Sequence, residues 1–303
     1  MREGLMKVYK MKKTVPTLTA LALLMPTLLA TTAEAQQEAK SYAVTTWNAS
    51  CSGSTRNAWD NMADAWYDEI TNEGFSFFGW CLSGHCADAF SRDGRQVNGN
   101  LVNSQFADRS VVGWGNDHNH MDEGDAALIA LHGFESGNNY GGRVRVNEAG
   151  GGDCNIMRSE MEAGDQDLEF LHLSSCQSMD DNQWSSWWQG FGRLHQVNGF
   201  HGLMWIGTGL VSDYEDFADD AFSSTIANSW LDNMYIPNIQ GNDDQCPVSY
   251  AVGTNSTDTW NRIGTERYNN VHSDPSSIGY WGVTFISGCD PQAETVINSD
   301  RSQ

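Results

Sequence analysis

The sequence predicts an α/β protein whose central sheet is mainly parallel, with helices on both faces. Two short apolar runs, at 126–131 and 168–173, end abruptly in polar residues, which is typical of buried parallel strands. Two other segments, at 59–70 and 214–234, carry apolar side chains three and four residues apart, the pattern of a helix with one buried face. Strands and helices that alternate along a chain favour a sheet covered by helices.

Residues 1–35 have the three parts of a secretory signal peptide. Basic residues between positions 7 and 13 precede an apolar run, and Ala33-Glu34-Ala35 forms a small-residue exit. The apolar run is shorter than the roughly 20 residues that a spanning helix needs, so we expect no retained membrane anchor. We expect cleavage near Ala35, which would leave a single domain at 36–303 in the periplasm or outside the cell.

The first half of this domain is predicted to hold few regular elements. Residues 41–47 alternate in polarity, which favours a strand, and the helix over 59–70 follows. A second short apolar run covers 75–80. Residues 81–119 are rich in Gly, Asn, Asp and Ser, and we expect loops there with an edge hairpin around 110–114.

The second half is predicted to alternate helices and strands more regularly. A helix from about 181 to 195 follows the second buried strand, and a longer helix covers 214–234. Further strands are expected at 197–206, 249–252 and 280–286.

The charge balance excludes several classes of partner. The chain has 17 basic and 39 acidic residues, a formal net charge of −22, and the predicted leader removes mostly basic residues. A surface this acidic repels nucleic acid and anionic lipid at long range, so we expect neither nucleic acid nor a membrane as partner. We expect a monomer that its charge keeps in solution.

An odd number of cysteines follows the leader. In an oxidising compartment six of the seven can pair and one must be left over. Only Cys81 and Cys86 are close enough in sequence to suggest a pair. The remaining thiol is either buried and inert or kept for chemistry.

Candidate reactive residues follow both predicted buried strands. His132-Gly133 comes directly after the first, and Ser174-Ser175-Cys176 ends the second. If these strands are neighbours, the imidazole and the thiol leave the same edge of the sheet, where ligands bind in open α/β folds. A thiol attacks an acyl carbon as thiolate and needs a base beside it, together with donors for the oxyanion. Gly133 has no side chain to keep a substrate carbonyl from its N–H.

A strand that ends in His-Gly, followed by a strand that ends in a small residue and Cys, resembles the caspase, legumain and gingipain group of cysteine peptidases. The similar stretches are 122–133, 168–176 and 194–200, and the chain looks most like uncharacterised exported bacterial members of that group. The resemblance implies a three-layer sandwich and an endopeptidase acting on protein or peptide substrates without a cofactor.

The same resemblance implies roles for individual residues. Cys176 would be the nucleophile and His132 the general base or acid, with the N–H groups of Gly133 and Cys176 as oxyanion hole. Asp122, Asp125 and Ser175 would support the site. The chain departs from the caspase pattern after the thiol, where it has Gln177-Ser178 in place of a glycine two residues on.

A second chemistry is suggested by the segment 116–122. His118, His120 and Asp122 resemble the zinc-binding run of metallo-β-lactamases, and such donors suit zinc. These residues would make the protein a metal-dependent hydrolase. The Asp and Asn oxygens of the same segment would instead suit a structural calcium ion. A third possibility is an inactive secreted binding module of the same fold, whose aromatic surface recognises a protein or glycan.

Overall fold

The computed structural model describes residues 4–10, 36–77, 80–146 and 153–292 of the 303-residue chain. A nine-stranded sheet forms its centre, in the order β1-β14-β13-β11-β10-β6-β2-β5, with β12 paired to β13 outside this path. The strands are β1 (Gly4–Lys10), β2 (Glu38–Ala43), β5 (Ser91–Val97), β6 (Ala126–Ala130), β10 (Phe170–Ser174), β11 (Gln196–His201), β12 (Ile236–Gln240), β13 (Asp243–Gly253) and β14 (Tyr280–Ile286).

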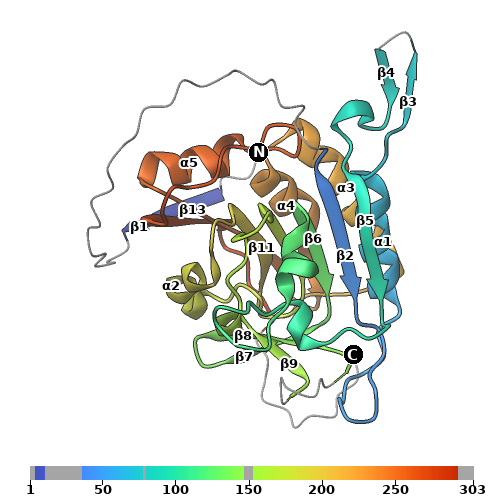
Figure 1. Cartoon of the computed structure of the whole chain (residues 1–303), viewed down its shortest axis with the longest axis vertical. Coiled ribbons are helices and arrows are strands. Elements are labelled where there is room, and N and C mark those ends of the chain that lie inside the picture. Colours follow the sequence, from blue (N-terminus) through green and yellow to red (C-terminus); the bar gives the residue numbers. More distant parts are fainter. Residues whose placement is uncertain (1–3, 11–35, 78–79, 147–152, 293–303) are drawn as a thin grey trace.

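The two halves of the sheet differ in strand direction. From β11 through β10, β6 and β2 to β5 every pairing is parallel, whereas β13, β14 and β1 are added antiparallel beyond β11. The carboxyl ends of the parallel strands therefore share one edge, at the bottom of Figure 1. The predicted α/β class with a mainly parallel sheet is confirmed.

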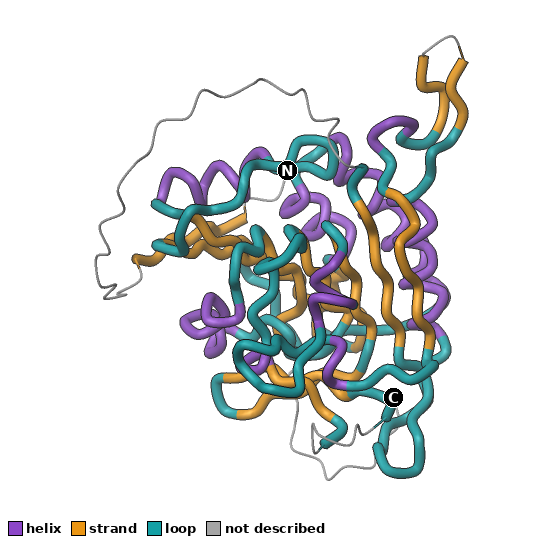
Figure 2. The backbone as a smooth tube through the Cα atoms, viewed as in Figure 1, coloured by secondary structure: helices purple, strands orange, loops and turns teal. Residues whose placement is uncertain are grey.

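Long helices cover one face of the sheet and mostly irregular chain covers the other (Figure 2). The expectation of helices on both faces is therefore corrected for the described residues. Alternate side chains of β6 and β10 point into two separate cores, because successive residues of a strand face opposite sides. One core lies under long helices rich in aromatic residues. The other lies under short turns and the four-residue helix α2. The helices are α1 (Ala58–Ile70), α2 (Trp184–Trp187), α3 (Val211–Ser223), α4 (Ile226–Met234) and α5 (Ser256–Thr265).

Two small sheets extend from this body. One lies at the carboxyl edge and contains β7 (His132–Ser136), β8 (Asn139–Arg143) and β9 (Asn155–Met157). The other is a hairpin of β3 (Phe75–Phe77) and β4 (Trp80–Ser83), which projects from the opposite end in Figure 1. No helix in the described part of the chain is both long and apolar enough to cross a bilayer.

Several predicted elements are corrected. The region 81–119 contains β5, a strand with a largely exposed polar sequence, and the hairpin expected around 110–114 is a set of turns. The helix expected at 181–195 is reduced to α2 and short 3₁₀ turns. The helix expected at 214–234 is two helices, because Thr225 leaves helical geometry and its hydroxyl caps α4 by accepting the N–H of Asn228 at 3.2 Å.

Most of the predicted leader lies outside the described residues, including 11–35 and the proposed cleavage site at Ala35. Residues 4–10 form β1 and pair antiparallel with β14.

Candidate functional site

The two strands that carry the candidate dyad lie side by side. β6 and β10 are parallel neighbours, with Ala130 paired to Ser174, and the N–H of Leu131 donates to the Ser174 carbonyl at 3.3 Å. His132 and Cys176 each lie two residues beyond that pair. The expectation that these strands are neighbours is confirmed, and both residues leave the sheet at its carboxyl edge.

Gly133 brings the two strand ends into contact. A Cβ atom at this position would lie 2.0 Å from the carbonyl oxygen of Cys176 and 2.3 Å from the hydroxyl oxygen of Ser175. Both distances are far below van der Waals contact, so only glycine fits here unless the main chain moves. The main chain after the histidine therefore packs directly on the main chain of the cysteine.

The imidazole of His132 is held by its surroundings. Its ring packs against the indoles of both Trp47 and Trp59, with centroid distances of 4.7 and 4.8 Å. Its Nε2 is 3.0 Å from the carbonyl oxygen of Ser54. A carbonyl oxygen only accepts hydrogen bonds, so Nε2 donates and the neutral ring keeps its lone pair on Nδ1. Nδ1 is therefore the nitrogen able to take a proton.

The same surroundings keep the ring neutral. Burial, together with the positive charges of Arg56 and Arg143, lowers the pKa of His132 to about 4, against the opposing effect of the Ser54 hydrogen bond. At neutral pH the imidazole is uncharged, which is the form that acts as a base.

Arg56 also interacts electrostatically with the thiol. Burial lowers the pKa of this guanidinium, and the negative charge of a Cys176 thiolate raises it. The attraction is mutual, so Arg56 favours the thiolate form of Cys176. Arg56 comes from the loop ahead of α1, two residues after Ser54, so one loop both anchors the imidazole and supplies this charge.

Cys176 is the one cysteine outside the disulfides. The bridges are Cys51–Cys154, Cys81–Cys86 and Cys246–Cys289, so the pairing predicted from closeness is confirmed. The thiol is partly exposed, and its sulfur lies 3.7 Å from the carbonyl oxygen of Met204, just beyond β11.

A strained turn follows the thiol. Gln177 has a φ of 52°, in the left-handed region that costs a residue with a side chain about 1 kcal/mol. Its N–H donates to the carbonyl of Gly202 at 2.7 Å. Ser178, at the position where the caspase group has glycine, donates from Oγ to the Ser175 carbonyl at 2.8 Å and accepts the Phe200 N–H at 2.9 Å. The turn is fixed against the end of β11.

Two buried tyrosines hold the residues ahead of the thiol. The hydroxyl of Tyr140 on β8 donates to Oγ of Ser175 at 2.9 Å, and the hydroxyl of Tyr214 on α3 lies 2.7 Å from Oγ of Ser174. Tyr140 and Tyr214 belong to the cores on opposite faces of the sheet. The main chain ahead of Cys176 is thus held from both faces of the sheet.

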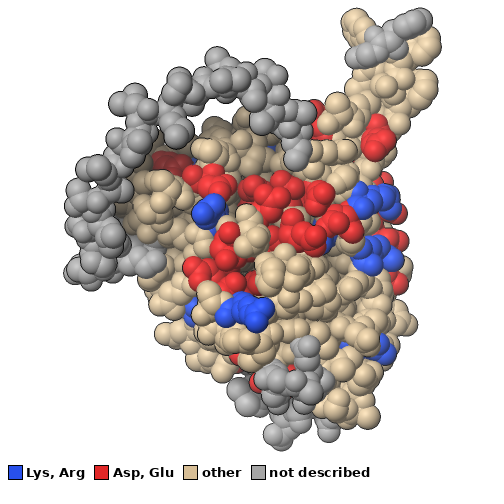
Figure 3. Space-filling model, in the orientation of Figure 1, with Lys and Arg blue, Asp and Glu red and all other residues tan. Residues whose placement is uncertain are grey.

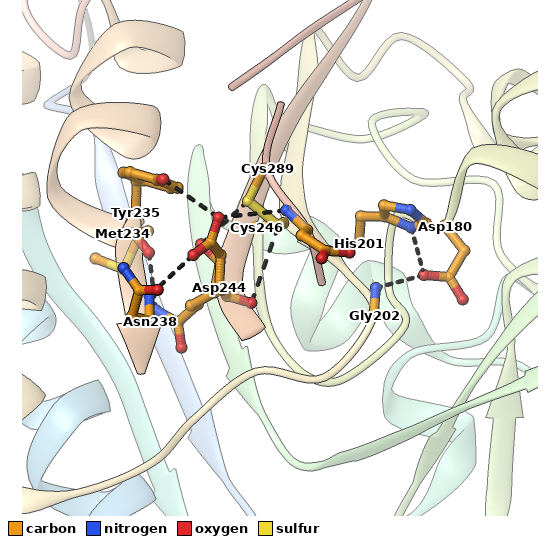
Figure 4. Close-up of a disulfide and its surroundings, with 11 residues drawn as sticks. Asp180, His201, Gly202, Met234, Tyr235, Asn238, Asp244, Cys246 and Cys289 are labelled. Carbon is orange, nitrogen blue, oxygen red and sulfur yellow. Dashed lines mark hydrogen bonds and ion pairs between the residues drawn. A yellow bond between two sulfur atoms is a disulfide. The ribbon is translucent and has the colours of Figure 1, made fainter. Parts of the chain in front are cut away.

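Asp180 joins the turn after the thiol to the carboxyl end of β11. Its carboxylate accepts the N–H of Gly202 at 2.6 Å and lies 3.0 Å from Nδ1 of His201, which Figure 4 shows turned toward it. Burial lowers the pKa of His201, but the hydrogen bond and charge of Asp180 outweigh burial and raise it overall. In Figure 4 the Cys246–Cys289 disulfide lies next to this end of β11.

The carboxylates expected to support the site lie elsewhere. Asp125 precedes β6 and accepts the N–H of Glu38 at 2.6 Å, and Asp122 accepts the N–H groups of Gly164 and Gln166 at 2.6 and 3.1 Å. Both therefore lie at the amino end of β6, about 16 Å of strand from the carboxyl edge. Their expected role beside the thiol is corrected: they hold loops at the opposite edge.

Asp122 is buried and Asp125 is half-buried. Burial, above all, raises the pKa of Asp122 to about 9 and that of Asp125 to about 6. Figure 3 shows acidic side chains gathered across the middle of one face, with few basic ones among them.

The suggested zinc ligands are not brought together. His118 is next to the side-chain amide of Asn119, with 2.9 Å between the nitrogens, and Nδ1 of His120 lies 3.4 Å from the amide nitrogen of Gln105. The carboxylate of Asp122 points to the loop at 164–166 instead. Among the described residues the groups with metal-ligand spacing are two others, Glu69/His85/Asp219 and Asp125/Asp167/Glu169.

The sequence profile of a domain of unknown function (DUF6345) matches residues 46–284, which is well over half of the chain. The chain belongs to this family. The DUF6345 region begins just ahead of Trp47 and ends within β14, so it contains the imidazole, the thiol and all the residues that hold them. A search of curated proteins found no match. Because the family description names no activity, function is argued from geometry.

Three residues of the site were not predicted from sequence. Ser54 acts through its main chain, which any residue offers, and Arg56 is a single basic residue in a loop. Tyr140 lies in a strand, β8, that contains two glycines and lacks the alternation of a strand.

Proposed function

We propose that this protein is an exported cysteine peptidase-like hydrolase of caspase-like fold, which uses Cys176 and His132 for acyl transfer on peptide bonds. The observation that carries the proposal is the parallel pairing of β6 with β10, which places His132-Gly133 against Ser175-Cys176 at one edge of the sheet. The thiol is outside the disulfides, and the imidazole keeps a basic nitrogen.

The proposed reaction has two steps. The proton of the Cys176 thiol passes to Nδ1 of His132, and the sulfur attacks the substrate carbonyl carbon. The oxyanion forms next to the main chain of Gly133 and Cys176, whose N–H groups are the proposed donors. His132 then protonates the leaving amine, and water hydrolyses the thioester to restore the thiol and release the acid. Arg56 favours the sulfur as thiolate before the attack.

Export fits the covalent structure. Three disulfides persist in an oxidising compartment and are rare in the cytosol. We therefore keep the proposal that residues 1–35 direct export and are removed near Ala35. Amino-terminal sequencing of protein collected outside the cytoplasm should give Gln36 as the first residue. A first residue at or near Met1 would contradict the processing.

The dyad is tested by alkylation of native protein. Iodoacetamide should modify Cys176 quickly, because a thiolate reacts much faster than a thiol, and His132→Ala should slow the reaction at least tenfold. His118→Ala, which changes a half-buried histidine outside the site, is the matched control and should leave the rate unchanged. Equal rates in wild type and His132→Ala would refute the pair.

Activity is tested with a library of fluorogenic peptides. Cleavage should vanish in Cys176→Ala. It should persist when EDTA removes metal ions, because the thiol reaction needs no metal whereas a metal-dependent hydrolase does. Cleavage that survives in Cys176→Ala would contradict the proposal.

A secreted binding module remains the second candidate, because the β3–β4 hairpin exposes large apolar side chains. Phe75, Phe77, Trp80 and Leu82 are 58, 55, 75 and 62 % exposed. Single exposed apolar residues are ordinary, but four on one projecting hairpin are typical of a surface that binds another molecule. Slow alkylation of Cys176 together with no cleavage of any library peptide would favour this candidate.

A further inference from the structure

We propose that Glu69, His85 and Asp219 form a binding site for a zinc-class divalent metal ion at the base of the β3–β4 hairpin. Glu69 is in the last turn of α1, His85 follows the hairpin, and Asp219 is on α3. One ligand atom from each lies within 4.8 Å of the other two. None of these three residues belongs to the strands that carry His132 and Cys176. The proposed metal site does not depend on the proposed peptidase activity.

The spacing of the donor atoms suits a tetrahedral ion. Nε2 of His85 is 3.0 Å from Oε1 of Glu69 and 3.9 Å from Oδ1 of Asp219. Two ligands bound to zinc at about 2.0 Å with a tetrahedral angle are roughly 3.3 Å apart. These two distances bracket this value, and the donors of Glu69 and Asp219 lie within 4.8 Å of each other, so side-chain movements suffice to enclose an ion.

The imidazole is already oriented. Its ring stacks on Phe222 with centroids 3.6 Å apart and planes at 13°, and its side chain is 6 % exposed. The main-chain N–H of His85 donates to the carbonyl of Asn72 at 2.8 Å. Because the ring is fixed before a metal arrives, little conformational entropy opposes binding.

Glu69 is oriented in the same way. Its second oxygen, Oε2, accepts from the side-chain amide of Asn72 at 3.2 Å, which leaves Oε1 directed at the imidazole. Hydrogen bonds of this kind to ligating carboxylates are a regular feature of metal sites. Asn72 therefore holds both inner ligands, one through its main chain and one through its side chain.

The ligand set selects the kind of ion. An imidazole with two carboxylates suits zinc and similar transition metals, whereas calcium prefers six or more oxygens. The Asp219 side chain is 68 % exposed, so solvent reaches the site and water can complete the coordination. The group Asp125/Asp167/Glu169 offers carboxylates alone and carries no proposal.

A bound ion would join three separate parts of the fold. His85 is next to Cys86, whose disulfide to Cys81 joins β4 to the 3₁₀ turn that follows it, so the ion would fix the hairpin base to α1 and α3. The aromatic side chains on β3 and β4 would then keep a constant direction relative to the body.

The test is a titration of the metal-free chain with zinc chloride, followed by calorimetry. Cys176→Ser is the background for every sample, so that the thiol cannot bind the metal. We expect one equivalent of zinc with a rise in Tm. His85→Gln and Asp219→Asn should each weaken binding at least tenfold, because each removes a ligand. His118→Gln is the matched control and should bind as the background does.

Asp219→Asn distinguishes the loss of a metal ligand from a failure to fold, because this exposed residue contributes little to packing. X-ray absorption at the zinc edge should show one imidazole nitrogen with oxygen ligands and no sulfur. The proposal is overturned if the background chain binds no zinc, if Asp219→Asn and His85→Gln bind as tightly as the control, or if the spectrum shows sulfur. Peptide cleavage by Cys176 plays no part in these readouts, so either proposal can fail alone.

Discussion

Gly133 lies against the main chain of Cys176, with room for a hydrogen atom and no room for a methyl group: a Cβ atom would be 2.0 Å from the cysteine carbonyl oxygen. Gly133→Ala should therefore push the two strand ends apart, lower the free energy of unfolding by about 1–3 kcal/mol and slow alkylation of the thiol. Urea unfolding and iodoacetamide kinetics measure both effects. Gly113→Ala, where a Cβ would meet nothing within 4 Å, should change neither.

His132 should make stability depend on pH. Its pKa in the folded chain is about 4, lowered chiefly by burial, against an ordinary value of 6.5. Between these values the unfolded chain binds a proton that the folded chain does not. Stability is therefore complete above pH 6.5 and is lost as the pH falls toward 4, by on the order of 2 kcal/mol.

Urea midpoints at several pH values test this dependence. The buried His172 contributes in the same direction, since burial lowers its pKa to about 3. The comparison is therefore between wild type and His132→Gln, which should lose less stability on acidification. Identical slopes would show that the imidazole of His132 is solvated in the native state.

The hydrogen bond from Tyr140 to Ser175 should be measurable as a coupling energy. Tyr140→Phe and Ser175→Ala each remove one partner of a buried 2.9 Å bond and should each cost about 1–2 kcal/mol. The double variant should cost less than the sum of the two, with about 1 kcal/mol of coupling. Simple additivity in urea unfolding would mean that the two hydroxyls are bonded to other groups in solution.

Arg56 should set the pH at which Cys176 reacts. Arg56→Gln removes a positive charge near the sulfur, so the pH of half-maximal alkylation should move upward. Arg92→Gln is the matched control, because Arg92 is exposed on β5 and paired with Asp68 at 2.6 Å. An unchanged profile in Arg56→Gln would show that solvent screens this charge fully.

The Cys51–Cys154 disulfide should matter more for stability than Cys81–Cys86. The first closes a loop of 103 residues and the second a loop of 5, and the loss of entropy in the unfolded chain grows with loop length. Replacing both cysteines of the long-range bridge by serine should cost about 2–4 kcal/mol, whereas the same change at the short bridge should cost less. Equal losses in Tm would contradict an entropic origin.

The parts of the fold that were predictable are those with a strong local pattern. The strands at 126–131 and 168–173 are buried on both faces, so their residues are apolar or small except Glu169 and His172, and their ends were placed within a residue or two. The odd number of cysteines predicted that one of them would lie outside the disulfides. The position of Cys176 and His132 at the same edge followed from a general rule of parallel sheets.

The parts that were missed depend on contacts that sequence periodicity does not record. β5 is an edge strand joined to β2 by main-chain pairing, so its polar side chains face water and carry no strand pattern. Asp122 and Asp125 lie close to His132 in sequence, yet a whole strand separates them from it in space. Ser54 and Arg56 reach the imidazole and the thiol only because the loop ahead of α1 folds over the sheet edge.

The pairing of β1 with β14 has a consequence for the processed protein. Every residue of Tyr280–Ile286 is matched to a residue of Gly4–Lys10, which belong to the predicted leader. Proteolysis near Ala35 would detach that segment and uncover the main-chain donors and acceptors along one side of β14. Removal of the leader would thus leave β14 as an exposed edge strand. A strand from another polypeptide can pair with such an edge, here on the side of the sheet away from the thiol.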